Sequence, residues 1–362
     1  MQTWRIGGPR VSLGVTALGG HLDDVCFATD GGCVRPLHTA PWSPDGHADD
    51  VPPMLRMLRG DFFCAPFGAS DLLPDEQRPH GAPANDVWEP VRISADAVEL
   101  ELRHAVAGAR LRKRVHVRPG EAAVYQEHTL AGGTGAVPIG HHAMLRAAEP
   151  LRISFSDWVW GGTPPEPLEP DPQRGTSLLA YPQTFTDLAH VRLAAGGTAD
   201  LRTFPVLERH EDLLMLVRAE QPAPAWTAAT APRAGWVWFA LKNPRVLRST
   251  VVWMSHGGRR YPPFAGRHTH ALGLEEVTAY FHLGHRASAG PNALAALGYP
   301  TAAVLRPDVP LRVRYVFGLA TTPPGFEAVA SLEATPGGVT LADAAGRTAF
   351  APVDTEFVLE EH

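Results

Sequence analysis

Apolar and polar residues alternate one by one in several stretches of the chain. Residues 98–103 and 111–117 each place mostly apolar side chains on one face and charged or polar side chains on the other, and residues 124–130 are interpreted as a third alternating stretch, which begins and ends with Val124 and Leu130 on one face. A period of two is typical of a strand that buries one face, so these stretches predict three successive antiparallel strands with solvent on the charged side. Residues 311–317 repeat the pattern late in the chain, with arginines between the apolar residues.

Other stretches lack this alternation. Residues 236–241 and 250–254 contain no charged residue, which predicts strands that are covered on both faces. Helical patterns are few. Residues 287–297 predict a short helix interrupted by Pro291, and residues 50–58 predict one turn or two.

Long segments rich in proline and glycine connect these elements, notably residues 36–53, 162–175 and 221–235. Long loops of this kind in a folded domain commonly surround a binding cleft. The strand patterns extend from about residue 10 to about residue 358, without an internal repeat or a shift in composition that would mark a linker.

We therefore expect an all-β protein in which residues 1–362 form a single domain, a large antiparallel β-sandwich. Residues 320–362 are expected to add C-terminal strands at 339–341, 350–353 and 357–359. These strands would complete the sandwich or pack on a second subunit, so a homodimer is an open expectation.

The composition argues against several classes of function. The 362 residues are 44% hydrophobic and include 35 glycines and 35 prolines, which interrupt long helices. A net charge of −6 without a basic block argues against nucleic-acid binding. No run of 18 apolar residues and no signal-peptide pattern is present, so we expect a cytoplasmic protein that does not bind membranes. Nucleotide-binding glycine loops and a serine-hydrolase elbow are also lacking.

The three cysteines, Cys26, Cys33 and Cys64, contain no CxxC pair. Their number and spacing predict neither a disulfide framework nor a zinc knuckle. We expect unpaired thiols, with a bridge between Cys26 and Cys33 as the alternative.

A first candidate for ligand binding is the segment that contains His80, Asn85 and Trp88. Imidazole and amide groups hydrogen-bond to hydroxyl groups, and an indole stacks on the apolar face of a sugar. The alternative is an ordinary turn with a buried tryptophan.

Two pairs of adjacent residues are candidates for acid–base chemistry. His141 and His142 follow the third predicted strand, and Glu275 and Glu276 lie within an otherwise apolar stretch. Neighbouring strand residues point to opposite faces, so only one member of each pair can face a given cleft. An imidazole or a partly buried carboxylate there could transfer protons. The alternatives are a core histidine beside a surface histidine, and an edge strand with both glutamates partly solvated.

Aromatic and histidine residues elsewhere suggest further contacts. Trp160 and His256 could line a saccharide cleft, although tryptophans at such spacing are more often core residues. His268 and His270 lie two residues apart, as a metal site on a strand would require, but no supporting ligand motif is present and we expect no metal.

Four arginines could together hold a phosphosugar: Arg146, Arg259, Arg260 and Arg267. The alternative for the pair Arg259 and Arg260 is a solvated loop.

Taken in order, these segments resemble the aldose 1-epimerase, or galactose mutarotase-like, superfamily. The resemblance rests on residues 18–25, on 58–68, on His80-Gly81 through Trp88, on Gly140-His141-His142 and on Leu274-Glu275, and it covers about residues 10–320. The sequence departs from the family pattern in three places, where an expected arginine is Ala84, an expected Pro-Tyr-Phe is Ala143-Met144-Leu145, and a proline is Glu276.

The resemblance implies a β super-sandwich that interconverts the anomers of a free or modified sugar without a cofactor. It implies Glu275 as the base and His142 as the acid, with Glu276 and His141 as the alternatives one residue away. The sugar would be held by a further set of residues: His80, Asn85, Trp88, Trp160 and His256. A carbohydrate-binding protein, or a saccharide hydrolase or lyase on the same fold, is the alternative function.

Overall fold

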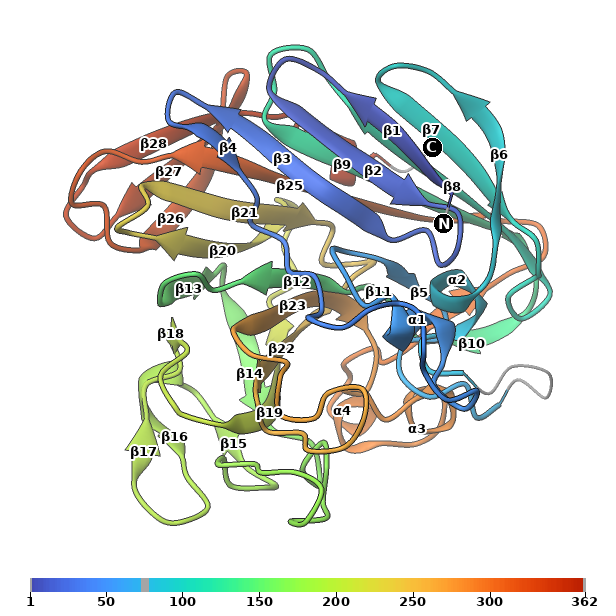
Figure 1. Cartoon of the computed structure of the whole chain (residues 1–362), viewed down its shortest axis with the longest axis vertical. Coiled ribbons are helices and arrows are strands. Elements are labelled where there is room, and N and C mark those ends of the chain that lie inside the picture. The colour runs from blue at the N-terminus through green and yellow to red at the C-terminus, as the bar shows by residue number, and fades with distance from the viewer. Residues whose placement is uncertain (1, 73–77, 361–362) are drawn as a thin grey trace.

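Strands supply most of the regular structure in the computed structural model, which describes residues 2–72 and 78–360. Two large antiparallel sheets lie face to face (Figure 1). The first has nine strands, in spatial order β18 (Thr203–Phe204), β13 (Leu151–Phe155), β20 (Ala225–Ala231), β21 (Trp236–Lys242), β25 (Leu311–Thr321), β9 (Ala123–Gly132), β8 (Ala109–Val117), β7 (Ala97–Leu102) and β6 (Trp88–Ile93). The second has eight, in order β15 (Thr184–Phe185), β14 (Trp158–Gly162), β19 (His210–Arg218), β22 (Ser249–His256), β23 (Ala271–Thr278), β11 (Ile139–His141) and β5 (Phe63–Cys64), with β12 (Ala143–Arg146) also paired to β23. The expected antiparallel β-sandwich is confirmed.

Smaller sheets extend the sandwich. An N-terminal sheet consists of β1 (Thr3–Gly7), β2 (Val11–Thr16), β3 (Leu22–Thr29) and β4 (Gly32–Val34). A C-terminal sheet consists of β26 (Val329–Thr335), β27 (Gly338–Asp343) and β28 (Thr348–Pro352). Two further pairs are β10 (Gly135–Val137) with β24 (Ala303–Leu305), and β16 (Val191–Arg192) with β17 (Thr198–Ala199).

The helices are single turns: α1 (Pro53–Arg56), α2 (Gly81–Asn85), α3 (His285–Ala289), α4 (Ala293–Ala296) and the 3₁₀ turns η1 (Leu188–His190) and η2 (Glu356–Val358). The break between α3 and α4 contains Pro291, as the sequence predicts. The expected strand at 357–359 is wrong, because Phe357 and Val358 belong to the 3₁₀ turn η2 and Leu359 follows it. None of the described helices is long and apolar enough to cross a membrane.

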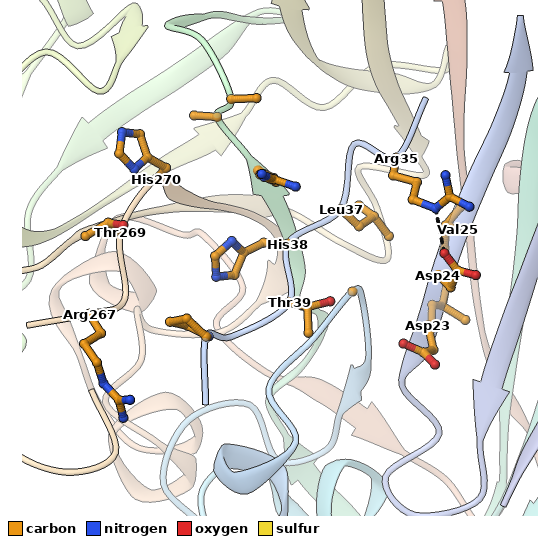
Figure 2. Close-up of a pocket in the computed structure, with 16 residues that line it drawn as sticks. Asp23, Asp24, Val25, Arg35, Leu37, His38, Thr39, Arg267, Thr269 and His270 are labelled. Atoms are coloured by element: carbon orange, nitrogen blue, oxygen red, sulfur yellow. Dashed lines mark hydrogen bonds and ion pairs between the residues drawn. The ribbon is translucent and has the colours of Figure 1, made fainter. Parts of the chain in front are cut away.

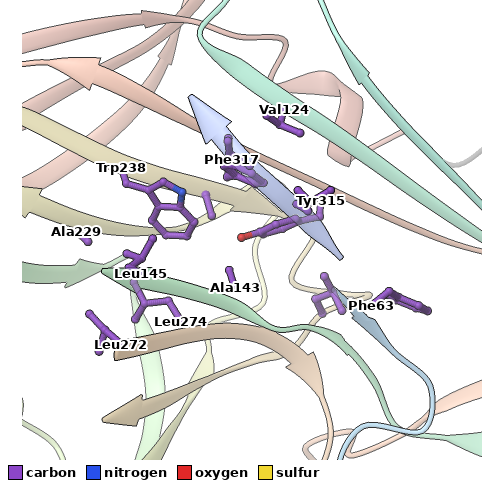
Figure 3. Packing of buried hydrophobic residues seen from close by; sticks show 14 of the residues in the cluster. Phe63, Val124, Ala143, Leu145, Ala229, Trp238, Leu272, Leu274, Tyr315 and Phe317 are labelled. Atoms are coloured by element: carbon purple, nitrogen blue, oxygen red, sulfur yellow. The ribbon is translucent and has the colours of Figure 1, made fainter. Parts of the chain in front are cut away.

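The main core lies between the two large sheets, where apolar side chains of both inner faces meet. Figure 3 shows this packing, with residues of the nine-stranded sheet opposite residues of β12 and β23: Trp238, Tyr315 and Phe317 face Leu145, Leu272 and Leu274. Strand β21 is buried at every position, as its unbroken apolar pattern predicts. Its alternate residues pack into two different cores, because its outer face is covered as well.

The outer face of the nine-stranded sheet is covered by the C-terminal sheet. Phe239 and Val316 from the large sheet share a core with Val339 and Leu341 of β27 and with Phe357 of η2. The segment after residue 320 therefore forms a third layer on this chain. At the far edge of the large sheet lies β6, whose pairing with β7 shifts register between Pro90 and Arg92.

Cys26 on β3 and Cys33 on β4 are joined by a disulfide, and Cys64 is a buried free thiol. The expectation that all three thiols are unpaired is therefore wrong. Their spacing alone did not indicate that the hairpin between β3 and β4 brings the two cysteines together.

A polar cluster interrupts the apolar core between the sheets. Lys242 of β21 and Glu276 of β23 form a fully buried ion pair across the two sheets. Thr227 and Thr250 donate hydrogen bonds of 2.5 and 2.7 Å to the two oxygens of Glu276. The ammonium of Lys242 also donates to the carbonyl of Ser249, 2.6 Å away. Both charges are thus paired and hydrogen-bonded, as buried charges require.

We expect Glu276→Gln to destabilise the protein by about 3–5 kcal/mol, because it leaves the ammonium of Lys242 buried without a counter-charge. The free energy of unfolding from urea denaturation measures this loss. The double variant Lys242→Met/Glu276→Leu should lose less than the single variant, because it removes both charges. A loss below about 1 kcal/mol in Glu276→Gln would show that this pair does not hold the sheets together.

Candidate functional site

Strand β23 carries two consecutive glutamates, and side-chain alternation sends them to opposite faces. Glu276 points into the core between the sheets, whereas Glu275 points to the outer face of the eight-stranded sheet, where it is 3% exposed. Gly273 lies two residues earlier on the same face. A Cβ at this glycine would lie 2.5 Å from Oε1 of Glu275, so the glycine leaves the space that the carboxyl group occupies. Because β23 is an inner strand, the alternative of a solvated edge strand is excluded.

His142 lies opposite Glu275, immediately before β12. Its Nε2 is 3.4 Å from Oε1 of Glu275. The imidazole stacks on the ring of Phe62, with centroids 4.6 Å apart, and the backbone N–H of His142 donates to the carbonyl of Phe62. These contacts hold the ring against the carboxyl group.

Two more imidazoles face the same space. His80 has a left-handed backbone conformation with φ 65° at the start of α2, and its ring meets that of His142 edge to face, with centroids 5.1 Å apart. The backbone N–H of Gly68 donates to Nδ1 of His80 across 3.4 Å. His282 follows β23 and lines the cavity as well. We call Glu275, His142, His80 and His282 the acid–base cluster.

An arginine completes the charged groups at this cavity. Arg259 lines it and lies 3.2 Å from a carboxylate oxygen of Glu211, which is itself buried on β19. Trp253 and Ser255 of β22 donate hydrogen bonds of 2.6 and 2.8 Å to the same carboxylate. Arg259 is thereby held at the wall of the cavity, with its guanidinium over the ring of Phe264.

Burial controls the protonation of the acid–base cluster. It raises the pKa of Glu275 well above its ordinary value, although the charge of Arg259 acts in the opposite direction. It lowers the pKa of His142 to about 3 and that of His282 to about 4. The pKa of His80 is also well below its ordinary value, for the same reason. A protonated carboxyl group beside neutral imidazoles is therefore favoured.

The cavity itself is small, about 90 Å³. Apolar side chains cover the acid–base cluster, among them Met54 and Leu55 of α1 and Phe264. Ligand sites for small molecules usually have roughly 300–1,000 Å³. The cavity is therefore smaller than the usual site for a small molecule.

The neighbouring histidine has a different environment. His141 points between the two sheets, where its Nδ1 lies 3.1 Å from a carboxylate oxygen of Asp61 and its ring stacks on Tyr315, with centroids 4.3 Å apart. The structure thus brings His142 to Glu275 and keeps His141 and Glu276 in the core between the sheets.

Asn85 and Trp88 do not line the cavity. Asn85 accepts a hydrogen bond from the backbone N–H of Met54 and donates to the carbonyls of Pro79 and Gly81, so its amide joins α1 to α2. Trp88 is 1% exposed and packs in the main core.

Trp160 and His256 also lie apart from the acid–base cluster. Trp160 is partly buried and packs against Phe281, with ring centroids 6.0 Å apart. His256 lies at the end of β22, where its Nδ1 accepts a hydrogen bond from the backbone N–H of His270. Of the predicted site residues, the structure brings together Glu275, His142 and His80.

Three residues of this region did not stand out in the sequence as part of one site. Arg259 was one of four arginines, and His282 one of 17 histidines. Glu211 could have been found from its position, because Glu211-Asp212 is an acidic pair beside an apolar run. Glu275-Glu276 is an acidic pair of the same kind. Within the described residues, no group of three His, Cys, Asp or Glu side chains could hold a metal ion.

No known protein-family model matches the sequence, and no curated protein matches it. Solved structures do resemble the fold. A candidate aldose 1-epimerase from Escherichia coli K12 is 14% identical, with a TM-score of 0.57 over 88% of this chain and 99% of that one. A galactose mutarotase-related enzyme from Lactobacillus acidophilus is 10% identical, with a TM-score of 0.54 over 88% and 97% of the two chains.

A galactose mutarotase-like protein from Lactobacillus casei is 12% identical, with a TM-score of 0.54 over 88% of this chain and 100% of that one. At such identities the likeness establishes the fold and leaves the chemistry of the site open. The chain has the β-sandwich fold of the galactose mutarotase-like proteins, as the resemblance in the sequence implied.

Proposed function

We propose that this protein is an aldose 1-epimerase-like enzyme, which interconverts the anomers of a sugar by proton transfer at Glu275 and His142. The observation that carries the proposal is the direct contact of one carboxyl group with one imidazole, 3.4 Å apart, in a cavity with two further imidazoles. The likeness of the fold to mutarotase-like proteins supports the same class of reaction.

The reaction needs two proton transfers, one at the anomeric hydroxyl group of the sugar and one at its ring oxygen. Glu275 takes the proton of the anomeric hydroxyl while His142 gives a proton to the ring oxygen, and the bond between C1 and the ring oxygen breaks. After rotation about the C1–C2 bond, the hydroxyl that was the ring oxygen attacks the other face of C1. His142 then takes back its proton, and Glu275 protonates the new anomeric oxygen. No proton is gained or lost over the cycle.

The favoured protonation states of Glu275 and His142 in the free protein fit the ring-closing half of this cycle. A protonated Glu275 beside a neutral His142 is the state that closes the ring. Ring opening starts from the other distribution, with the proton on His142. The contact between Oε1 and Nε2 offers the path by which that single proton passes between the two groups. Hydrogen bonds from the hydroxyl groups of a bound sugar to Glu275 would favour its charged form and so bring the two distributions closer in energy.

A hydrolase is a weaker proposal for this cavity. Glycosidases use two carboxyl groups on either side of the scissile bond. Among the described residues that line the cavity, Glu275 is the only carboxylate. Sugar binding without catalysis is the remaining alternative, and the experiments below separate it from epimerisation.

Glu275→Gln is expected to lower the rate of anomer interconversion roughly 10²–10⁴-fold, because the amide cannot accept the anomeric proton. Polarimetry or NMR exchange on a panel of free aldoses and sugar phosphates measures the rate above that of buffer. Saturable binding of a sugar without any rate in the wild-type protein would establish the binding function instead.

His142→Asn and His141→Asn should have unequal effects on the same rate. The first removes the proposed acid, and the second changes a core histidine bonded to Asp61. We expect a loss of roughly 10²-fold or more only in His142→Asn, with both variants checked for native circular dichroism. Equal small losses in the two folded variants would contradict the assignment.

The rate should also have an unusual dependence on pH. The active pair holds one proton, so activity is lost on the acid side when His142 takes up a second proton, near its pKa of about 3. On the alkaline side it is lost when Glu275 ionises, at a pKa well above its ordinary value. An acid limb with its midpoint near 6.5, measured where the protein stays folded, would show that His142 titrates as an exposed histidine.

A further inference from the structure

A second pocket, larger than the cavity of the acid–base cluster, lies between the N-terminal sheet and the end of β12. Its volume is about 670 Å³, within the usual range for small-molecule sites. In Figure 2 polar residues of separate segments line opposite sides of it, with His38 between them: Arg267, Thr269 and His270 on one side, and Arg35, Asp23 and Asp24 on the other.

The two acidic residues of this pocket already have partners. Asp24 lies 2.7 Å from Arg35 and 3.4 Å from Arg5. Asp23 lies 3.0 Å from Arg59. Their negative charge is therefore balanced by these three arginines, of which Arg35 also lines the pocket.

Two arginines of the pocket have no such balance. Among the described residues, no carboxylate lies within ion-pair distance of Arg146 or Arg267, and both side chains are exposed at the pocket wall. The only hydrogen bond recorded in the described structure for the guanidinium of Arg267 goes to the carbonyl of Pro263, 3.2 Å away. The pocket consequently has an excess of positive charge.

His38 adds a polar group that the protein itself does not satisfy. The residue is 7% exposed, and its buried Nε2 has no hydrogen-bond partner in the described part of the chain. Burial lowers the pKa of His38 to about 4, and the charges of Arg146 and His270 act in the same direction. Its imidazole is thus neutral at pH 7. That enclosed Nε2 is not itself open to the pocket, so His38 contributes the part of its neutral ring that lines the wall.

We propose that this pocket binds a small hydroxylated molecule through an oxyanion, a phosphate or carboxylate group, held by Arg146 and Arg267. Guanidinium groups form charge-assisted and often bidentate hydrogen bonds with both anions. His38 and Thr269 supply neutral hydrogen-bonding groups beside the arginines.

This site is separate from the acid–base cluster. Arg146 lies four residues after His142 along β12, which corresponds to roughly 13 Å in an extended strand. His268 stands between the two spaces, where its ring contacts those of His38 and Trp253, with centroids 4.8 and 5.3 Å away. The site does not depend on the proposed epimerase reaction.

Isothermal titration of the full chain with four probes tests the proposal: inorganic phosphate, glucose 6-phosphate, glucuronate and glucose. We expect saturable binding of the charged probes and none of glucose at this pocket. Comparison of glucose 6-phosphate with glucuronate decides between phosphate and carboxylate. Absence of saturable binding by every charged probe, inorganic phosphate included, would overturn the proposal.

Variants locate the binding. Arg146→Gln and Arg267→Gln should each weaken binding of the charged probes roughly tenfold or more, because each removes a charged hydrogen-bond donor. Arg306→Gln, at an exposed position on another part of the surface, is the matched control and should bind like the wild type.

Glu275→Gln should keep the affinity for inorganic phosphate. Loss of that affinity in Glu275→Gln, or full affinity in both arginine variants, would place the anion elsewhere and contradict the site.

Discussion

The position of β23 between two different interiors is the constraint on which the proposed site depends. On one face, Glu276 is fixed by Lys242 and two threonines across the sheet interface. The preceding side chain on the strand, that of Glu275, must therefore point to the other face. There it lies against His142. A slip of one residue would place either Val277 opposite Lys242 or Leu274 beside His142, so only the observed register serves both partners with a carboxyl group. The buried ion pair thus contributes to the register of the strand as well as to its stability.

Burial gives the acid–base cluster its chemistry. Glu275 and His142 are both almost fully enclosed, so their charged forms are disfavoured and the proton resides on the carboxyl group. The only cation at the cavity wall among the described residues, Arg259, is tied to Glu211. The fold alone does not provide this arrangement. The solved structures with a similar fold are only 10–14% identical to the chain, so the function must be argued from the side chains.

The sequence predicts the fold well where the pattern repeats. Period-two alternation locates β7, β8, β9 and β25, and unbroken apolar runs locate β21 and β22. It also shows that only one of His141 and His142 can face a cleft. The sequence could not decide which of the two histidines faces the cleft, because the residues around both are small or apolar. The choice depends on contacts with Asp61 and Glu275, two residues that are distant in the sequence. Arg259 and His282 lie outside regular strands, where periodicity carries no information. The short apolar run at 357–359 fits a strand or a helical turn equally, and packing on the sheet selects the turn.

The irregular edge strand β6 has a consequence for how this protein meets other chains. An open sheet edge presents free N–H and C=O groups that can pair with a strand of a second molecule. On β6, Pro90 lacks an N–H, and the register shift beside it bends the strand away from a regular ladder. Val91 and Ile93 are about half exposed there, so the strand would otherwise be an apolar template. The nine-stranded sheet is therefore protected at this edge against growth by strand addition, the first step of domain swapping and fibril formation.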